Sequence, residues 1–245
     1  MTALYDHIGT RYSLGRRTDP EIAERIHAHL MTADSILNIG AGTGSYEPQG
    51  ANLIAVEPSL TMIQQRPSNA HLAKQATAEA LPFEDNAFSH GMTVLSMHHW
   101  SDRQAAFDEI KRVVRKRFVA LTWNPDSKPY WLSERYFPEI HQIDQSIFPT
   151  LAELEEAFPG IKFITLPIPA NCKDGFTASF WARPEAYLNP EVRASMSTFS
   201  KINALESGLQ KLEVELNNGF WQTQYGDLRH RSHLDTGYII AVWDQ

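Results

Sequence analysis

SILNIGAGTG, residues 35–44, joins a short apolar run to three glycines at alternate positions. An apolar run that ends abruptly in glycines is typical of a buried parallel strand whose chain turns sharply at its end. Because glycine has no Cβ, a ligand can lie directly on such a turn, and the N–H groups beyond it can bind polar ligand atoms. We therefore predict a strand over residues 35–39, followed by a ligand-binding turn.

A second apolar run, NLIAV at residues 52–56, ends in the acid Glu57. In nucleoside-binding α/β proteins, a carboxylate at this point accepts hydrogen bonds from the two ribose hydroxyls. The glycine turn and Glu57 together predict a site for a nucleoside-containing cofactor. The connection between the two strands contains Pro48 and Gly50 and is shorter than the dozen or so residues that crossovers normally need. We expect only a truncated turn of helix there.

Strand-like and helix-like segments alternate along the rest of the chain. Apolar runs bounded by turn residues predict further strands at residues 71–76, 87–95, 118–123, 161–166 and 237–243. Helices are predicted between them, the first beginning at Pro20 with Asp19 as its N-cap. This alternation indicates an α/β fold with helices on both faces of a mostly parallel sheet. A largely helical, aromatic-rich insertion at residues 171–231 precedes the last strand.

Composition narrows the possible classes of protein. A chain of 245 residues suits one domain with an elaboration, and its net charge of −7 argues against a dedicated nucleic-acid binder. Cys172 is the one cysteine, so a disulfide framework or thiolate cluster cannot form within one chain, and we expect no metal site. The sequence shows no signal peptide and no apolar run of membrane-spanning length. We expect a cytoplasmic monomer or homodimer that does not bind membranes.

Three motifs carry a resemblance to a known family: ILNIGAGTGSY from residue 36, LIAVEPSLTMI from residue 53, and ATAEALPFEDNAFSHGMTVLSMHHW from residue 76. Together they resemble the class I S-adenosylmethionine-dependent methyltransferases, in particular the small-molecule branch of the UbiE/type-11 kind. The resemblance is strong over roughly residues 30–125. It implies a Rossmann-like, doubly wound, seven-stranded sheet with a reversed last strand. It divides the single domain into N-terminal cap helices (1–30), a cofactor-binding core (31–170), a helical lid insertion (171–231) and the final strand (232–245).

The resemblance also implies which residues contact S-adenosylmethionine. The glycine turn would lie under its methionine and ribose, Met62 would pack on the adenine, and Arg16 would bind the carboxylate. The backbone after the fourth strand would lie near the sulfonium. The residues assigned in this way are Tyr12, Arg16, Gly40, Ala41, Gly42, Glu57, Met62, Ala78, Glu79, Thr93 and Val94.

Two positions depart from the family pattern. Asn38 stands where an aspartate is common, which removes a negative charge near the cofactor's ammonium group. Thr77 stands where an acid usually holds the adenine amino group, so the Ala78 backbone or Glu79 would have to serve instead. These departures leave room for a protein that binds the cofactor without catalysis.

The segment His98-His99-Trp100 is the candidate catalytic segment, and it has two interpretations. The pair of histidines is either a polar helix start or contains a general base, in which case His99 would take a proton from a substrate hydroxyl or amine. Sulfonium methyl transfer needs mainly alignment of the reactants and exclusion of water, so no triad or metal is required.

Other functions compete with the transfer of a methyl group to a small, apolar or aromatic acceptor. A nicotinamide-dependent oxidoreductase would prefer glycine or alanine at Ser45 and a longer helix behind the turn. A protein or RNA methyltransferase would show an open basic face. The basic residues in KRVVRKR, 111–117, are more typical of a solvated helix C-terminus than of a nucleic-acid site. The aromatic side chains of 171–231 favour a closed pocket and a small-molecule acceptor.

Overall fold

The computed structural model describes residues 15–245 and contains a seven-stranded mixed sheet in the order β3-β2-β1-β4-β5-β9-β6. The first five of these strands are parallel, and β9 runs antiparallel to both β5 and β6. The predicted fold class, with its reversed last strand, is thus confirmed. The strands are β1 Ile36–Ile39, β2 Leu53–Glu57, β3 Ala73–Gln75, β4 Phe88–Val94, β5 Val114–Trp123, β6 Lys162–Thr165 and β9 Tyr238–Asp244.

Several helices begin at a residue whose side chain caps the helix N-terminus. The Asp19 carboxylate accepts hydrogen bonds from the first-turn N–H groups of α2, and Ser59 and Thr150 cap α3 and α6 in the same manner. These caps satisfy backbone donors that have no partner within the helix. The main helices are α2 Pro20–His27, α3 Leu60–Gln64, α4 Arg103–Val113, α5 Pro138–Ile147 and α6 Leu151–Ala157.

Alternate side chains of the central strands pack into two separate cores. On β5, Val119 and Leu121 pack on one face of the sheet in the same core as α2. Phe118 and Ala120 pack on the other face with residues of α4 and α6. Since successive side chains of a strand point to opposite faces, helices can cover both sides of the sheet. The predicted layer arrangement is therefore correct.

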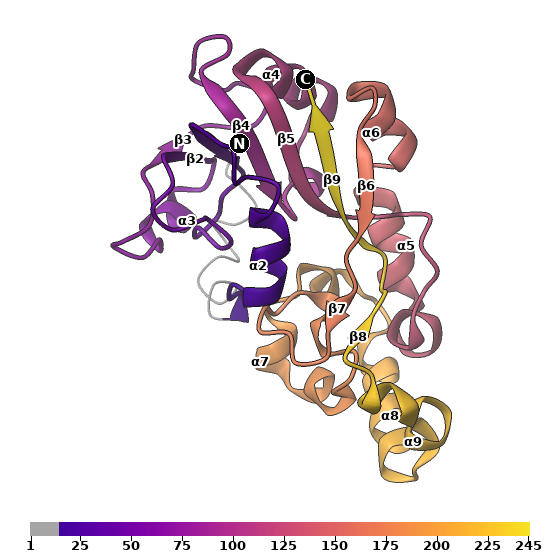
Figure 1. Cartoon of the computed structure of the whole chain (residues 1–245). Helices are drawn as coiled ribbons and strands as arrows, with labels where there is room; N and C mark the ends of the chain where they lie inside the picture. The colour runs from indigo at the N-terminus through magenta and orange to yellow at the C-terminus, as the bar shows by residue number, and fades with distance from the viewer. Residues whose placement is uncertain (1–14) are drawn as a thin grey trace.

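A third core lies between residues 131–140 and the insertion. Trp131 in the turn before η2 (Leu132–Tyr136) packs against Tyr187 and Trp221. Figure 1 shows α7–α9 below the sheet, at the edge where the parallel strands end. The elements of this part are η3 Thr177–Phe180, η4 Pro184–Leu188, α7 Pro190–Arg193, η5 Ser197–Lys201, α8 Leu205–Asn217, α9 Phe220–Tyr225 and η6 Gly226–His230. A short ribbon of β7 (Ile168–Pro169) and β8 (His233–Leu234), not expected from the sequence, connects this part to the sheet.

Two local expectations were wrong. Residues 45–52 form turns and not a turn of helix, because Gly44 and Tyr46 have φ values of +92° and +66°, outside the right-handed helical region. The strand expected at 118–123 begins at Val114, so Arg115, Lys116 and Arg117 lie on β5 and not at a helix C-terminus.

Candidate active site

The glycine turn follows β1 and is fixed from two sides. The N–H groups of Gly40 and Ala41 donate to the Val56 carbonyl at 2.9 and 3.0 Å, which joins the turn to β2. Gly40 and Gly42 have φ values of +67° and +54°, a conformation that L-residues with side chains rarely adopt. A Cβ at Gly40 would overlap the Ser96 side chain, whereas the Cβ position of Gly42 has, among the described residues, only Met62 Cε, at 3.3 Å, within 4 Å. The turn is thus packed by protein on one side and open at Gly42.

Glu57 connects the turn to the start of α3. Its Oε2 atom accepts a hydrogen bond of 2.8 Å from Gly42 N, and its Oε1 atom accepts one of 2.9 Å from Ser59 N. The residue is only 5% exposed. A carboxylate can accept further hydrogen bonds at each oxygen, so this position remains suited to ribose hydroxyls.

A buried ion pair that the sequence did not reveal lies beneath the turn. Arg66 Nη2 is 2.8 Å from both carboxylate oxygens of Glu47, and Arg66 Nη1 donates to the Gly42 carbonyl at 3.2 Å. Asn38 Nδ2 donates to Glu47 Oε1 at 3.0 Å. The Asn38 Oδ1 atom is buried and has no hydrogen-bond partner among residues 15–245. No motif marks Glu47 or Arg66, because only folding brings them together.

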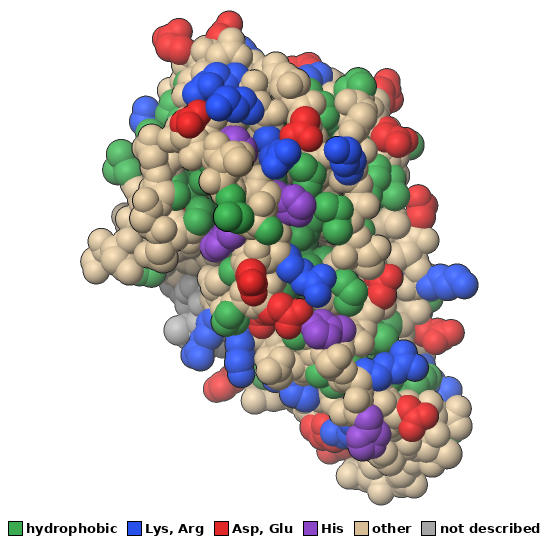
Figure 2. Space-filling view, viewed as in Figure 1, with side chains coloured by type: hydrophobic (Ala, Val, Ile, Leu, Met, Phe, Trp, Pro, Cys, Tyr) green, Lys and Arg blue, Asp and Glu red, His purple; other side chains and the backbone are tan. Residues whose placement is uncertain are grey.

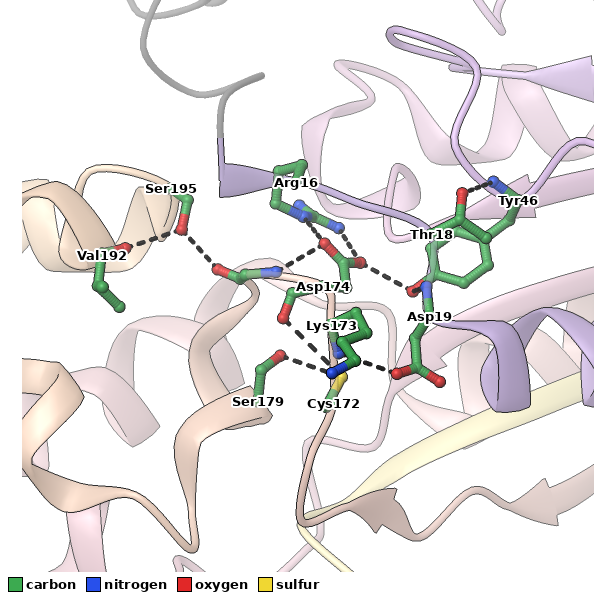
Figure 3. A network of polar contacts seen from close by, with 11 residues as sticks. Arg16, Thr18, Asp19, Tyr46, Cys172, Lys173, Asp174, Ser179, Val192 and Ser195 are labelled. Atoms are coloured by element: carbon green, nitrogen blue, oxygen red, sulfur yellow. Dashed lines mark hydrogen bonds and ion pairs between the residues drawn. The ribbon is translucent and has the colours of Figure 1, made fainter.

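A second polar network links the turn to the insertion (Figure 3). The Tyr46 hydroxyl donates to Asp174 Oδ2 at 3.0 Å, and Arg16 makes two contacts of 2.6 and 3.0 Å with the same carboxylate. Thr18 Oγ1 accepts a hydrogen bond of 3.1 Å from Tyr46 N, and Asp19 Oδ2 accepts one of 2.9 Å from Lys173 N. Burial, and then the charge of Asp174, raises the pKa of the Tyr46 hydroxyl, which therefore remains a donor.

This network bears on two of the predicted cofactor contacts. Arg16, assigned to the cofactor's carboxylate, directs its guanidinium at Asp174, so at least part of its donor capacity is used within the protein. That assignment stays a prediction. Tyr12, assigned to the same region, lies outside the described residues.

The residues assigned to the adenine side occupy different environments. Met62 is buried, with its methyl group facing Gly42, and Ala78 is also buried. The Glu79 carboxylate accepts hydrogen bonds from Ser101 N, Ser101 Oγ and Asp102 N at 2.8–3.3 Å. Burial raises the pKa of Glu79, but these bonds outweigh it and the net pKa is lowered. Glu79 thus holds the segment that leads into α4, a structural task the sequence did not indicate.

The end of β4 brings the remaining candidates to the turn. Thr93 Oγ1 donates to the Ile39 carbonyl at 2.8 Å, and Val94, half-buried, ends the strand. His99 follows in the short helix η1, Met97–His99, which also contains His98. Burial, together with the charges of Lys201 and Arg16, lowers the pKa of His99 to about 4. At neutral pH the imidazole is therefore uncharged and able to accept a proton, although it is a weak base.

These groups meet where the order of the sheet changes direction. β1 lies between β2 and β4. The chain passes from β1 to β2 and β3 on one side of β1, and then crosses to β4 on the other side. In open α/β sheets, ligands bind in the crevice outside the carboxyl ends of the strands at this point. Of the predicted residues, the structure places the glycine turn, Glu57 and Met62 in direct contact and joins Thr93 to the strand that leads into the turn.

Comparison with known proteins agrees with this geometry. The family description "Methyltransferase domain" matches residues 37–119. A crystal structure of a protein from Anabaena variabilis, described as a methyltransferase from an antibiotic biosynthesis pathway, is 32% identical to this chain with a TM-score of 0.85. The alignment covers 94% of this chain and 98% of that one. The chain belongs to the class I S-adenosylmethionine-dependent methyltransferases.

Two further proteins are similar to this methyltransferase, the second of them in its fold. The uncharacterized methyltransferase YcgJ of Bacillus subtilis is 29% identical over 125 residues, which is 46% of this chain and 45% of the Bacillus protein. Geranyl diphosphate C-methyltransferase of Streptomyces coelicolor, solved with S-adenosylhomocysteine, has a TM-score of 0.52 at 16% identity, covering 91% of this chain and 75% of that one. The enzyme uses S-adenosylmethionine, and the open side of Gly42 and the unpaired Asn38 Oδ1 suit such a ligand.

The basic run at residues 111–117 is neutralised by nearby acids. Lys116 Nζ and Arg115 Nη2 lie 2.8 and 3.5 Å from Asp34, and Arg117 pairs with Asp244 at 2.6 Å. On the face shown in Figure 2, lysine and arginine groups lie beside acidic ones and form no continuous basic surface. The described part of the methyltransferase contains no helix able to span a membrane, and residues 15–245 hold no cluster of three or more His, Cys, Asp or Glu side chains suited to a metal ion.

Proposed function

We propose that this methyltransferase acts on a small molecule with an aromatic or apolar body, enclosed between the carboxyl edge of the sheet and the insertion of residues 171–231. The observation that carries this proposal is a small recess, partly open to solvent, lined by residues of the sheet edge and of the insertion. Its apolar wall includes Trp123, Ile140 and Ala178. Small-molecule sites are typically concave and mostly apolar, with a few polar groups.

The cofactor would be held by residues already close to one another. Gly40, Ala41 and Gly42 offer the open turn, Glu57 offers carboxylate oxygens for the ribose, and Met62 and Ala78 offer apolar surface for the adenine. S-adenosylmethionine supplies a methyl group on a positively charged sulfur, which an acceptor atom can displace in line. The protein's task is then to orient the acceptor and to exclude water.

His99 is the candidate proton acceptor of this reaction. It lies in η1, a few residues after the end of β4, to which we assign the sulfonium, and its neutral state at pH 7 leaves it able to accept a proton. Its lowered pKa makes it a weak base, so we expect its contribution to be modest. The reaction itself depends mainly on alignment.

The proposed function is tested in two steps. Calorimetry with S-adenosylhomocysteine and, separately, with NAD should show binding of the first compound only. The protein is then incubated with S-adenosylmethionine labelled on the methyl group, a panel of hydroxylated and amine-bearing aromatic compounds, bulk RNA and a protein mixture. Label extracted into organic solvent supports a small-molecule acceptor. Label confined to precipitated protein or RNA would refute the proposal.

A further inference from the structure

A pocket with unpaired polar groups lies beside the predicted reaction site. It is formed where β5 ends at Trp123 and β9 begins at Tyr238, two residues that pair in the sheet register. Helix α5 contributes Asp144, and residue Thr177 of η3 comes from the insertion. The pocket therefore joins the sheet to the insertion at the carboxyl edge of β5.

Three polar side chains that line this pocket have hydrogen-bonding capacity that no described residue uses. Asp144 is buried; its Oδ1 atom accepts a 2.9 Å hydrogen bond from Thr198 Oγ1, while Oδ2 accepts none from the described residues. The Thr236 Oγ1 atom is buried and has no hydrogen-bond partner in the described part of the chain. The Tyr238 hydroxyl likewise makes no hydrogen bond within residues 15–245. Buried polar groups in folded proteins are nearly always hydrogen-bonded, so Thr236 Oγ1, together with Asp144 Oδ2 and the Tyr238 hydroxyl in the same pocket lining, can bind a polar group of a ligand.

We propose that this pocket binds a neutral hydroxyl group of the methyl acceptor, with Asp144, Thr236 and Tyr238 as its hydrogen-bonding partners. This inference rests on the proposed function and identifies the polar group that the acceptor carries. A hydroxyl has one donor and two acceptor sites. The pocket offers the complementary set, because Asp144 Oδ2 can accept one hydrogen bond and the hydroxyls of Thr236 and Tyr238 can each donate one.

The electrostatics of the pocket favour a neutral ligand. Burial raises the pKa of Asp144 to about 7, against the hydrogen bond from Thr198 and the charge of Lys201. Burial, followed by the Asp144 charge, keeps the pKa of Tyr238 well above its usual value, so its hydroxyl stays protonated. An anionic ligand group would be repelled by the Asp144 carboxyl, which is partly ionised at neutral pH. Such a group also has no hydrogen to donate to Asp144 Oδ2.

One layer of aromatic rings separates this pocket from the histidines after β4. The Trp123 ring lies 5.7 Å from the Phe148 ring, measured between centroids, and Phe148 stacks on His98 at 4.2 Å. Phe148 directly follows α5, the helix that carries Asp144. Packed aromatic rings therefore connect the wall of the pocket to η1.

Phenol and toluene test the inference, since they differ by a hydroxyl in place of a methyl group, and benzoate serves as the anionic probe. Dissociation constants are measured by ligand-observed NMR on the full chain. We expect phenol to bind the native protein about tenfold more tightly than toluene, the effect of one or two hydrogen bonds, and benzoate to bind more weakly than phenol. Tyr238→Phe and Asp144→Asn should each reduce the preference for phenol severalfold.

Tyr225→Phe is the matched control, because the Tyr225 hydroxyl also lacks a hydrogen bond among the described residues but lies on α9, outside this pocket. It should leave the preference for phenol unchanged. Equal affinities of the native protein for phenol and toluene, or a preference that survives in both pocket variants, would overturn the inference. Benzoate binding as tightly as phenol would also overturn it. A separate titration with S-adenosylhomocysteine distinguishes the two proposals, since its failure refutes the proposed function and leaves the phenol result standing.

Discussion

The difference between two glycines with positive φ gives the sharpest test of the cofactor site. Gly42 (φ +54°) lies in the turn after β1, and Gly50 (φ +73°) lies a few residues later in the same connection. In the part of the chain that the structure describes, a Cβ at Gly50 meets nothing within 4 Å, and a Cβ at Gly42 meets only Met62 Cε at 3.3 Å. Alanine at either position therefore imposes a similar backbone strain and a small steric cost within the protein.

The magnitude follows from the conformation. Placing a residue with a Cβ in the left-handed region costs roughly 1–2 kcal/mol. For a chain of this size, each kcal/mol lowers the melting temperature by about 2–4 °C. Gly42→Ala and Gly50→Ala should thus both lower the melting temperature by a few degrees. Only Gly42→Ala should also weaken cofactor binding, by about tenfold or more, equivalent to about 1.4 kcal/mol, because its methyl group enters the open side of the turn.

Calorimetric titration with S-adenosylhomocysteine, together with thermal denaturation, measures both effects. Gly40→Ala provides a steric reference, since its Cβ would overlap Ser96 and should destabilise the fold more than either other substitution. Native affinity in Gly42→Ala would refute the assignment of the open side of the turn to the cofactor. An equal loss of affinity in Gly50→Ala would show that the effect is strain and not contact.

Three further predictions concern the charged groups around the turn. Asp174→Asn breaks the buried ion pair with Arg16 and should lower the free energy of unfolding, measured in urea, by about 3 kcal/mol. Tyr46→Phe removes one hydrogen bond to the same carboxylate and should lower it by about 1 kcal/mol. Equal losses in the two variants would contradict this order. Asn38→Asp places a second carboxylate against Glu47 and should lower the melting temperature, and a Glu47→Gln substitution in the same chain should restore much of the loss. The pKa of His99 is lower in the folded than in the unfolded state, so the free energy of unfolding should be unaffected by this group above pH 6.5 and should fall as the pH falls toward 4, by up to about 2 kcal/mol at pH 5. His99→Gln should reduce that loss of stability at acid pH. An unchanged pH profile of the unfolding free energy in this variant would refute the lowered pKa.

The sequence was informative where local pattern and structure coincide. The glycine turn, the acid that ends β2, and the caps Asp19, Ser59 and Thr150 all depend on residues within a few positions of one another. The seven strands were all predicted, because each is a short apolar run between turn residues. The reversed last strand came from the family resemblance, since apolar periodicity does not show strand direction.

The start of β5 shows why local pattern was insufficient elsewhere. Helix α4 ends at Val113 and β5 begins at Val114, with no glycine or proline between them. The charged residues that follow fit either a helix end or an exposed strand end. Only pairing with β4 and β9 decides between them, and that pairing joins residues far apart in the chain.

The polar networks around the site were also beyond the reach of pattern. Arg16 and Asp174 are 158 positions apart, and Asp144 and Thr198 are 54 apart. An isolated Asp or Arg in a sequence gives no sign of burial, because charged residues are mostly exposed. Glu79 was considered only as a substitute for the acid missing at Thr77, and its hydrogen bonds to Ser101, 22 positions away, have no local signal in the sequence.

The Asn38 departure is explained by a neighbour that the family pattern does not include. Glu47 approaches to 3.0 Å, both Glu47 and Arg66 are almost wholly buried, and Arg66 supplies the one positive charge that the structure shows paired with Glu47. An aspartate at 38 would place two carboxylates against one guanidinium out of contact with water, where like charges at this distance cannot both ionise. Asparagine avoids this conflict, since its amide nitrogen donates to Glu47 while its Oδ1 atom remains a neutral acceptor. The negative charge next to the turn therefore belongs to Glu47 in this protein, and not to residue 38 on β1 as in the family pattern. A cationic group of the cofactor would still meet a hydrogen-bond acceptor at Asn38.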